Sequence, residues 1–222
     1  EFVSVVAHEL KVPMTSISGY ADLLKVVGPI TDQQQEFIEK VKSNVTRMKV
    51  LVTDLSDISR IESGNLRMDI APTDPASVIT QARDGAMTQI EERAHDYVED
   101  VPDDLPPVMA DQTRLTQVLL NLLSNAYKYT PDGGTITMKA WQDGAAVAFS
   151  VQDTGVGMTE EEVANLGKKF WRADNDHAIN QPGTGLGFAI TRNLITLMGG
   201  ELVIESEPGQ GSAFTFTIPA ES

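Results

Sequence analysis

The first residues that suggest chemistry are a neighbouring histidine and glutamate, His8 and Glu9, in the stretch VVAHELKVPMTSI. Histidine changes charge close to physiological pH, so this one could be an ordinary surface residue or a reacting one. Pro13 follows five residues later and would remove one backbone donor from a helix. The pair by itself leaves both interpretations open.

A second group lies in the stretch NLLSNAYKYT, where Asn121 and Asn125 are four residues apart and Lys128 follows. Residues with this spacing share one face of a helix. Two amides and one cation on a common face could hold a hydrated Mg²⁺ ion and the oxygens of a triphosphate, because hard cations take oxygen ligands. The same pattern is also typical of the polar edge of a core helix.

The stretch DTGVGM begins with Asp153 at the end of a predicted strand and contains Gly155 and Gly157. Glycines allow the backbone to approach a flat ligand closely, and a carboxylate can accept a hydrogen bond from an exocyclic amine. A tight turn that merely needs two glycines would look the same.

The stretch GTGLGF, residues 183–188, opens a predicted helix and could bind phosphate through free N–H groups and the helix dipole. A dinucleotide site would require a strand before it, but a polar loop precedes it, so we reject that interpretation. The loop from about Gly167 to Gly183 carries Lys168, Lys169 and Arg172, and it is predicted to form a lid or a plain surface loop.

Two long helices are expected to carry the histidine. Apolar residues recur every three or four positions along residues 3–27 and again along 38–58, and Gly28, Pro29 and Thr31 mark the turn between the two helices. The pattern predicts an antiparallel hairpin over residues 1–62. One hairpin has little to bury against, so we expect two copies to form a four-helix bundle in a homodimer.

The remaining chain has a different pattern. Residues 63–75 are rich in helix breakers and are predicted to be a linker. Residues 76–222 combine predicted helices, over 76–93, 114–130 and 187–200, with two hairpins, the first turning at Asp143 and Gly144. This order predicts an α+β fold, a two-layer sandwich of helices on an antiparallel sheet.

Composition restricts the partners. The 222 residues carry a formal net charge of −15 and no cysteine. Such a surface repels nucleic acid and anionic membranes, and a disulfide framework or thiolate metal site is excluded. No apolar run is long enough to span a membrane. The chain starts at Glu1 without a methionine, and we expect it to be a fragment whose upstream part is missing.

Taken together, the motifs resemble those of the sensor histidine kinases of two-component systems. NLLSNAYKYT, DTGVGM and GTGLGF are similar to the N, G1 and G2 boxes, FWR to the F box and FVSVVAHELKVPMTSI to the H box. All five occur in the order of the family and span nearly the whole chain. The resemblance implies a dimerisation and phosphotransfer hairpin followed by an ATP-binding domain of the Bergerat fold.

The resemblance implies that His8 is the phospho-acceptor and that Glu9 accepts its ring proton. It also implies that the chain uses ATP and Mg²⁺. Asp153 would bind the adenine amine, and Asn125, with Asn121, would hold the Mg²⁺ ion. The complete set of nucleotide-binding residues carried over is Asn121, Asn125, Lys128, Tyr129, Asp153, Gly155, Gly157, Phe170, Arg172, Gly183, Thr184, Gly185, Leu186 and Gly187.

One position departs from the family. Four residues after the histidine the family often has threonine or asparagine, which orients a water for dephosphorylation of the response regulator. Val12 stands there and cannot hydrogen-bond a water. We therefore expect kinase activity with weak phosphatase activity.

The expected function is ATP-dependent autophosphorylation followed by transfer to an aspartate of a response regulator, in the cytoplasm. Any membrane attachment would reside in the missing upstream segment. Two alternatives remain. A gyrase-like or chaperone-like ATPase would need a glutamate where Asn121 stands, and a dimeric scaffold that only binds nucleotide would be expected to have lost part of a motif.

Overall fold

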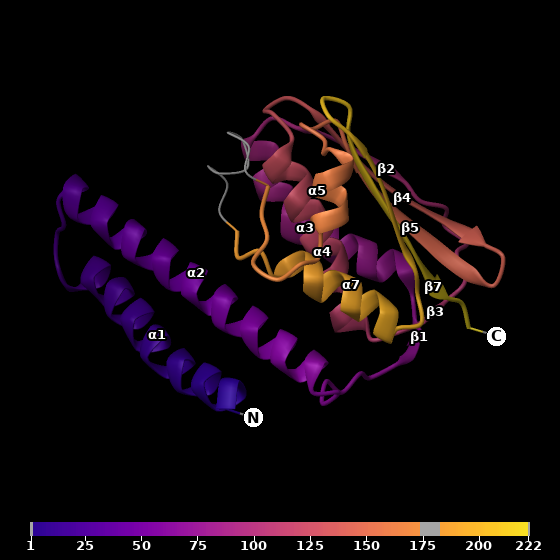
Figure 1. The fold of residues 1–222 in the computed structure, drawn as a ribbon. Helices are drawn as coiled ribbons and strands as arrows, with labels where there is room; N and C mark the ends of the chain where they lie inside the picture. Colours follow the sequence, from indigo (N-terminus) through magenta and orange to yellow (C-terminus); the bar gives the residue numbers. More distant parts are fainter. Residues whose placement is uncertain (1, 174–182, 222) are drawn as a thin grey trace. The chain divides into compact units, whose positions relative to one another are not determined.

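A computed structural model describes residues 2–173 and 183–221. The chain divides into two compact units, Glu1–Leu66 and Arg67–Ser222 (Figure 1). None of the helices within the described residues is long and apolar enough to cross a membrane.

The first unit is a helical hairpin of α1, Phe2–Val27, and α2, Asp32–Glu62. Residues 28 and 29 end the first helix as predicted, and Thr31 caps the second. The Thr31 hydroxyl accepts from the Gln34 backbone N–H at 3.2 Å, and the Gln34 side chain accepts from the Thr31 N–H at 2.8 Å. This reciprocal capping box satisfies two N–H groups that the first helical turn cannot bond internally.

The core of the hairpin repeats every seven residues. The repeat consists of the buried residues Ala7, Met14 and Ala21 on α1 and Ile38, Val45 and Val52 on α2, and Ile58 near the end of α2 is also buried. Ion pairs of Lys25 with Glu39 and of Lys42 with Asp22 link the two helices beside this core. The other half of each predicted stripe remains exposed, at Leu10, Ile17, Leu24, Val41, Met48 and Leu55.

The second unit contains a five-stranded sheet in the order β2-β4-β5-β7-β6. Its strands are β2 Asp96–Asp100, β4 Thr135–Asp143, β5 Ala146–Asp153, β6 Leu202–Glu207 and β7 Gly211–Pro219. The β4–β5 and β6–β7 hairpins confirm the two predicted from the sequence, and only β2 pairs in parallel. A small separate sheet joins β1, Ala71–Thr73, to β3, Val108–Ala110.

Helices cover one face of the large sheet (Figure 1). They are α3 Pro75–Glu92, α4 Gln112–Tyr129, α5 Glu160–Asn165 and α7 Gly187–Leu197. Between the layers lie fully buried apolar side chains, among them Leu119 and Leu122 of α4 and the stacked rings of Phe149 and Phe216. The predicted α+β two-layer sandwich is confirmed.

Within the described residues, four elements were not predicted: β1, β2, β3 and α5. Strand β1 lies within residues 63–75, where a linker was expected, because Ala71 to Thr73 pair with β3. The Thr73 hydroxyl also donates to the Ala110 carbonyl at 3.0 Å. This part of the expected linker is thus built into the second unit.

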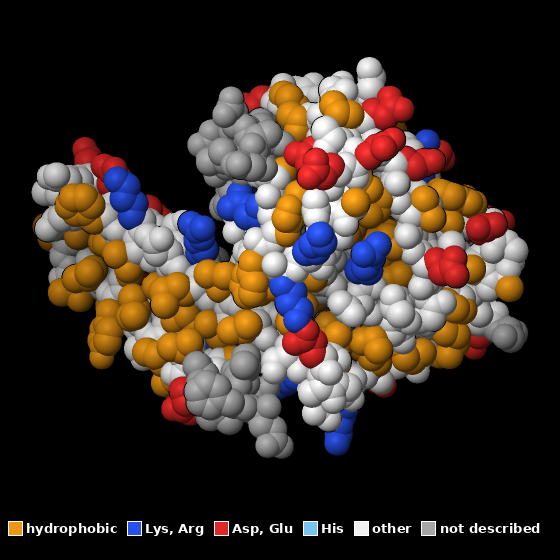
Figure 2. All heavy atoms as spheres, in the orientation of Figure 1, with side chains coloured by type: hydrophobic (Ala, Val, Ile, Leu, Met, Phe, Trp, Pro, Cys, Tyr) orange, Lys and Arg blue, Asp and Glu red, His pale blue; other side chains and the backbone are white. Residues whose placement is uncertain are grey.

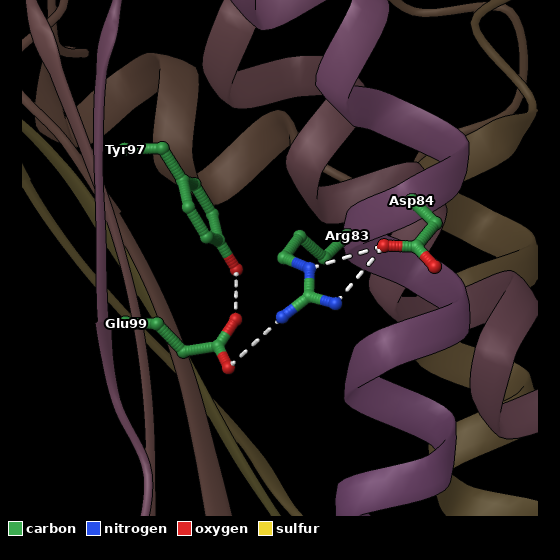
Figure 3. A network of polar contacts seen from close by, with 4 residues as sticks. All are labelled: Arg83, Asp84, Tyr97 and Glu99. Atoms are coloured by element: carbon green, nitrogen blue, oxygen red, sulfur yellow. Dashed lines mark hydrogen bonds and ion pairs between the residues drawn. The ribbon is translucent and has the colours of Figure 1, made fainter.

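A polar network attaches the edge strand β2 to α3 (Figure 3). The Tyr97 hydroxyl donates to Glu99 Oε2 at 2.9 Å, and Glu99 lies 3.6 Å from the Arg83 guanidinium. Arg83 also donates to Asp84 at 3.0 Å. Burial and the bond to Glu99 raise the pKa of Tyr97, so its hydroxyl remains a donor. The network holds an otherwise acidic edge strand against the helical layer.

Candidate functional site

The polar edge of α4 places three of the predicted residues on one side of a buried helix. Asn121, Asn125 and Lys128 are all half-buried, whereas the opposite face of α4 lies in the core. The Asn121 side-chain nitrogen donates to the Thr191 hydroxyl of α7 at 2.6 Å. Among the described residues the Asn125 side chain has no hydrogen-bond partner, so its amide oxygen is available to a ligand.

Positive charge gathers at the end of α4. Burial lowers the pKa of Lys128, and the nearby Arg93 and Arg172 lower it further. The Lys128 ammonium also lies 5.7 Å from the centre of the Tyr127 ring. Three cations close enough to influence one another, in a chain of net charge −15, form a local site for an anion.

Asp153 ends β5 as a nearly buried carboxylate, with 9% of its surface exposed. It accepts the Gly155 N–H at 2.8 Å. Burial raises the pKa of this carboxyl to about 6, although backbone N–H groups of Gly155 and Ser212 oppose the shift. A cavity of about 890 Å³ has Asp153, Ser212 and Val163 of α5 in its lining.

Two glycines after Asp153 lie where no side chain fits. A Cβ on Gly155 would come within 2.4 Å of the Tyr129 carbonyl oxygen, and one on Gly157 within 1.9 Å of the Glu207 carbonyl oxygen. Gly157 also has a φ of 62°. The Val156 N–H donates to the Tyr129 oxygen at 3.1 Å. The loop after Asp153 is therefore fixed directly onto the end of α4.

The glycines at 183–187 form the other side of the site. Gly185 has a φ of 71° and packs on the backbone of Phe170, whose N–H donates to the Gly185 oxygen at 3.0 Å. The Phe170 side chain is 63% exposed. The Leu186 N–H donates to the Thr184 hydroxyl, and Leu186, the N-cap residue of α7, makes no side-chain cap.

Gly183 lies near Arg172, whose guanidinium carbon would be 4.0 Å from a Cβ built on that glycine. Gly187 packs against Asn121, because a Cβ there would be 2.8 Å from the Asn121 oxygen. The central part of the expected lid, residues 174–182, lies outside the described residues.

The predicted nucleotide residues come from α4, the end of β5 and the start of α7, and the contacts above join these three segments. The set offers a hydrated Mg²⁺ ion one free amide oxygen, at Asn125. The described residues hold no group of three or more histidine, cysteine or carboxylate side chains that could bind a metal unaided. Mg²⁺ readily keeps waters and takes oxygens from substrate phosphates, so one protein ligand fits a metal that arrives with a nucleotide.

On the hairpin, Glu9 and Val12 are exposed, Val12 by 61%. His8 lies within α1, and its side chain is outside the described part of the structure.

Sequence reasoning missed Arg93, Thr191 and Gly211. Gly211 has a φ of 90°, and a Cβ there would lie 1.9 Å from the Asp153 carbonyl oxygen. The stretch PGQG, which ends at Gly211, already indicated a turn, but nothing in the sequence placed that turn against Asp153. Arg93 and Thr191 carry no local motif, and only the packing of α3 and α7 on α4 shows their role.

Comparison with known proteins agrees with this site. The family model for the histidine kinase-, DNA gyrase B- and HSP90-like ATPases matches residues 110–222. The model for the His Kinase A (phospho-acceptor) domain matches residues 1–64.

Among curated relatives, the circadian input-output histidine kinase CikA of Synechococcus elongatus is 36% identical over all of this chain. The non-motile and phage-resistance protein of Caulobacter vibrioides is 34% identical over 99% of it. The chain spans only 30% and 27% of these two relatives. The crystal structure of full-length ShkA in complex with AMPPNP is 29% identical, with a TM-score of 0.83. The match covers all of this chain and 46% of the ShkA chain.

The two family models match residues 1–64 and 110–222, one for each half of the chain, and the relatives match over its whole length. The chain belongs to the sensor histidine kinases and contains both their phospho-acceptor hairpin and their ATP-binding catalytic domain.

Proposed function

We propose that this chain transfers the γ-phosphate of ATP to His8 and then to an aspartate of a response regulator. The observation that carries the proposal is the assembly around α4. A cationic end with a free amide, at Lys128 and Asn125, is bonded through the backbone to the loop of a buried carboxylate, Asp153. One end suits a triphosphate and the other an amine-bearing base.

At the base end, the Asp153 carboxylate accepts a hydrogen bond from the adenine amine, and Gly155 and Gly157 let the ring lie close to the backbone. At the phosphate end, Lys128 and Arg172 neutralise charge, and the start of α7, where the N-cap residue Leu186 makes no side-chain cap, offers its N–H groups. We propose that Tyr129, Gly183 and Gly185 line the same pocket, as the family likeness implies. The structure of ShkA with AMPPNP supports a nucleotide of this class.

The phosphoryl step joins the two units. A neutral ring nitrogen of His8 attacks the γ-phosphorus, the bond from that phosphorus to the β–γ bridging oxygen breaks, and ADP leaves with the electron pair. Glu9 takes the proton from the other ring nitrogen as the ring becomes cationic. Mg²⁺ bound with the nucleotide would neutralise charge on the phosphate oxygens, and Asn125 is the residue that would hold it. Transfer of this kind depends chiefly on positioning and charge.

We propose that the active form is a homodimer through residues 1–62. The hairpin buries only half of each apolar stripe, and the other half repeats every seven residues on both helices, at 40% exposure or more. Figure 2 shows apolar side chains gathered along the hairpin. A second hairpin that covers these rows would complete a four-helix bundle.

The Val12 side chain supports weak phosphatase activity, because it is exposed on α1 and offers no group to orient a water. Val12→Thr should raise the rate at which phosphorylated regulator loses its phosphate. Strong activity in the natural sequence would contradict this part of the proposal.

The response regulator's receiver domain is the proposed partner, and the cytoplasm, where ATP is available, the proposed location. The division into a phosphotransfer hairpin over 1–62 and a catalytic domain within 76–222 also belongs to the proposal. A dimer that binds nucleotide without phosphorylating itself is the competing function.

Incubation with Mg²⁺ and γ-labelled ATP tests the proposal, with His8→Gln as the matched variant. Label that is stable to base, labile to acid and absent from the variant would support a histidine kinase with His8 as the acceptor. Label that persists in His8→Gln would refute the assignment of His8. Binding of ATP without any label would favour the nucleotide-binding dimer.

A further inference from the structure

The side chain of Asn121 is already engaged within the protein. Its nitrogen donates to the hydroxyl of Thr191 at 2.6 Å, and Thr191 is 1% exposed. Its oxygen lies over Gly187, 2.8 Å from the position that a Cβ would occupy there. The whole amide is therefore packed between α4 and the first residue of α7.

This placement distinguishes Asn121 from Asn125. A ligand of Mg²⁺ needs an oxygen that the ion can approach to about 2.1 Å in octahedral geometry. The Asn121 oxygen lies 2.8 Å from the Cβ position of Gly187 and so close against α7, whereas the side chain of Asn125, one turn further along α4, has no hydrogen-bond partner within the described residues. The two amides share a helix face but have different surroundings.

We propose that Asn121 is a positioning residue, which the Thr191 hydroxyl holds in place so that it sets the start of α7 against α4. The inference rests on the proposed nucleotide site. The N–H groups at the start of α7 would meet the phosphates, because the N-cap residue Leu186 makes no side-chain cap there, and their distance from Asn125 and Lys128 depends on this contact. Thr191 acts through Asn121 and does not touch the nucleotide.

The absence of a side chain at Gly187 is part of the same arrangement. The Asn121 side chain approaches α7 so closely that residue 187 has no room for a Cβ. This approach brings the Asn121 amide within reach of Thr191, one turn further along α7. A methyl group there would have to displace the amide, whose short side chain has few other places to go.

Binding of a fluorescent ATP analogue, in Mg²⁺ and separately in a chelator, tests the inference. Thr191→Val removes the hydroxyl and keeps the shape, and Asn121→Ala removes its partner. Each should weaken binding by about three- to tenfold, the usual effect of one lost hydrogen bond. The factor should be the same with and without Mg²⁺, and the double variant should be no weaker than the single ones.

Three further variants serve as controls. Thr196→Val makes the same change on the exposed side of α7, where the hydroxyl only bonds its own helix, and should not alter binding. Thr191→Ser keeps the hydroxyl and should retain affinity. Asn125→Ala should instead raise the Mg²⁺ concentration needed for half-maximal binding.

Two outcomes would overturn the inference alone. If Asn121→Ala raised the Mg²⁺ requirement as Asn125→Ala does, Asn121 would be a metal ligand. If Thr191→Val lowered only the thermal stability and left affinity intact, the hydroxyl would merely fill the core. A wild-type chain that bound the analogue in neither buffer would overturn the nucleotide site itself, and with it the proposed function.

Discussion

The replacement Asp153→Asn should make the folded protein more stable but weaken its binding of ATP. The reason is that the Asp153 carboxylate lies in an environment that disfavours its charge. Burial raises the pKa of Asp153 from 3.8 to about 6. At neutral pH that difference corresponds to about 3 kcal/mol of destabilisation of the folded state. Asparagine has nearly the same shape and no charge, and its oxygen can still accept the Gly155 N–H.

We expect Asp153→Asn to raise the free energy of unfolding by about 1–3 kcal/mol at pH 7.5. The gain can be smaller than the full amount of about 3 kcal/mol because burial of the new NH₂ group of asparagine costs part of it. The sign follows from the protons bound. The folded carboxyl stays protonated up to a higher pH than the unfolded one, so the wild type loses stability as pH rises from about 4 through 6. The advantage of the variant should therefore grow over this interval and level off above pH 7.

The same replacement should weaken ATP binding by about 10- to 150-fold, the equivalent of one charge-assisted hydrogen bond of about 1.5–3 kcal/mol. An asparagine whose nitrogen faces the adenine amine would put donor against donor.

Urea unfolding followed by tryptophan fluorescence measures the stability of the relevant unit. Both tryptophans, Trp141 and Trp171, lie in the second unit, so the hairpin does not contribute to the signal. Asp143→Asn, at the exposed end of β4, is the matched control and should shift stability little at any pH. A stability change for Asp153→Asn that is independent of pH between 5 and 8 would refute the reasoning from burial.

Three further changes test other parts of the structure. Gly157→Ala, with φ of 62° and a Cβ 1.9 Å from a backbone oxygen, should abolish nucleotide binding and lower the unfolding midpoint, and retained affinity would show that the loop relaxes. Met48→Glu should dissociate the dimer in sedimentation, whereas Val50→Glu, equally exposed but on another side of α2, should not. Tyr97→Phe should destabilise the second unit by about 1 kcal/mol in urea and leave ATP affinity unchanged, and a loss of affinity would connect β2 to the site.

The elements that the sequence predicts correctly are those whose signals are local. Both helices of the hairpin have seven-residue repeats, and Thr31 with Gln34 is a capping box. Strand β2 was missed because its sequence, DYVED, is acidic and its partner is β4, which begins 39 residues later with Thr135 beside Asp96. Helix α5 is only six residues long, although Thr159 and Glu162 form the capping box that would have marked it.

The candidate site follows the same rule: residues with a local signal could be predicted, and those that depend on a distant element could not. Motifs name the residues that we propose to face the ligand, because each carries a chemical group or a glycine at fixed spacing. They do not name residues whose role depends on another element. Thr191 is an ordinary small residue on a core helix until α7 packs on α4, and Arg93 lies before the range that the ATPase family model matches.

The two ends of the nucleotide site are built differently, and this difference should govern how each tolerates change. At the base end, backbone meets backbone. Gly155 lies against Tyr129, and Gly157 against Glu207, so almost any side chain at either glycine must move the main chain. At the phosphate end Gly185 packs on the Phe170 backbone, but the contact between α4 and α7 is made by two side chains, Asn121 and Thr191.

A contact between two side chains can be exchanged for another pair or loosened without refolding the unit. Substitutions at the base end should therefore tend to abolish nucleotide binding outright. Those at the phosphate end should tune affinity in steps, and differences in affinity among chains of this architecture should arise mainly there.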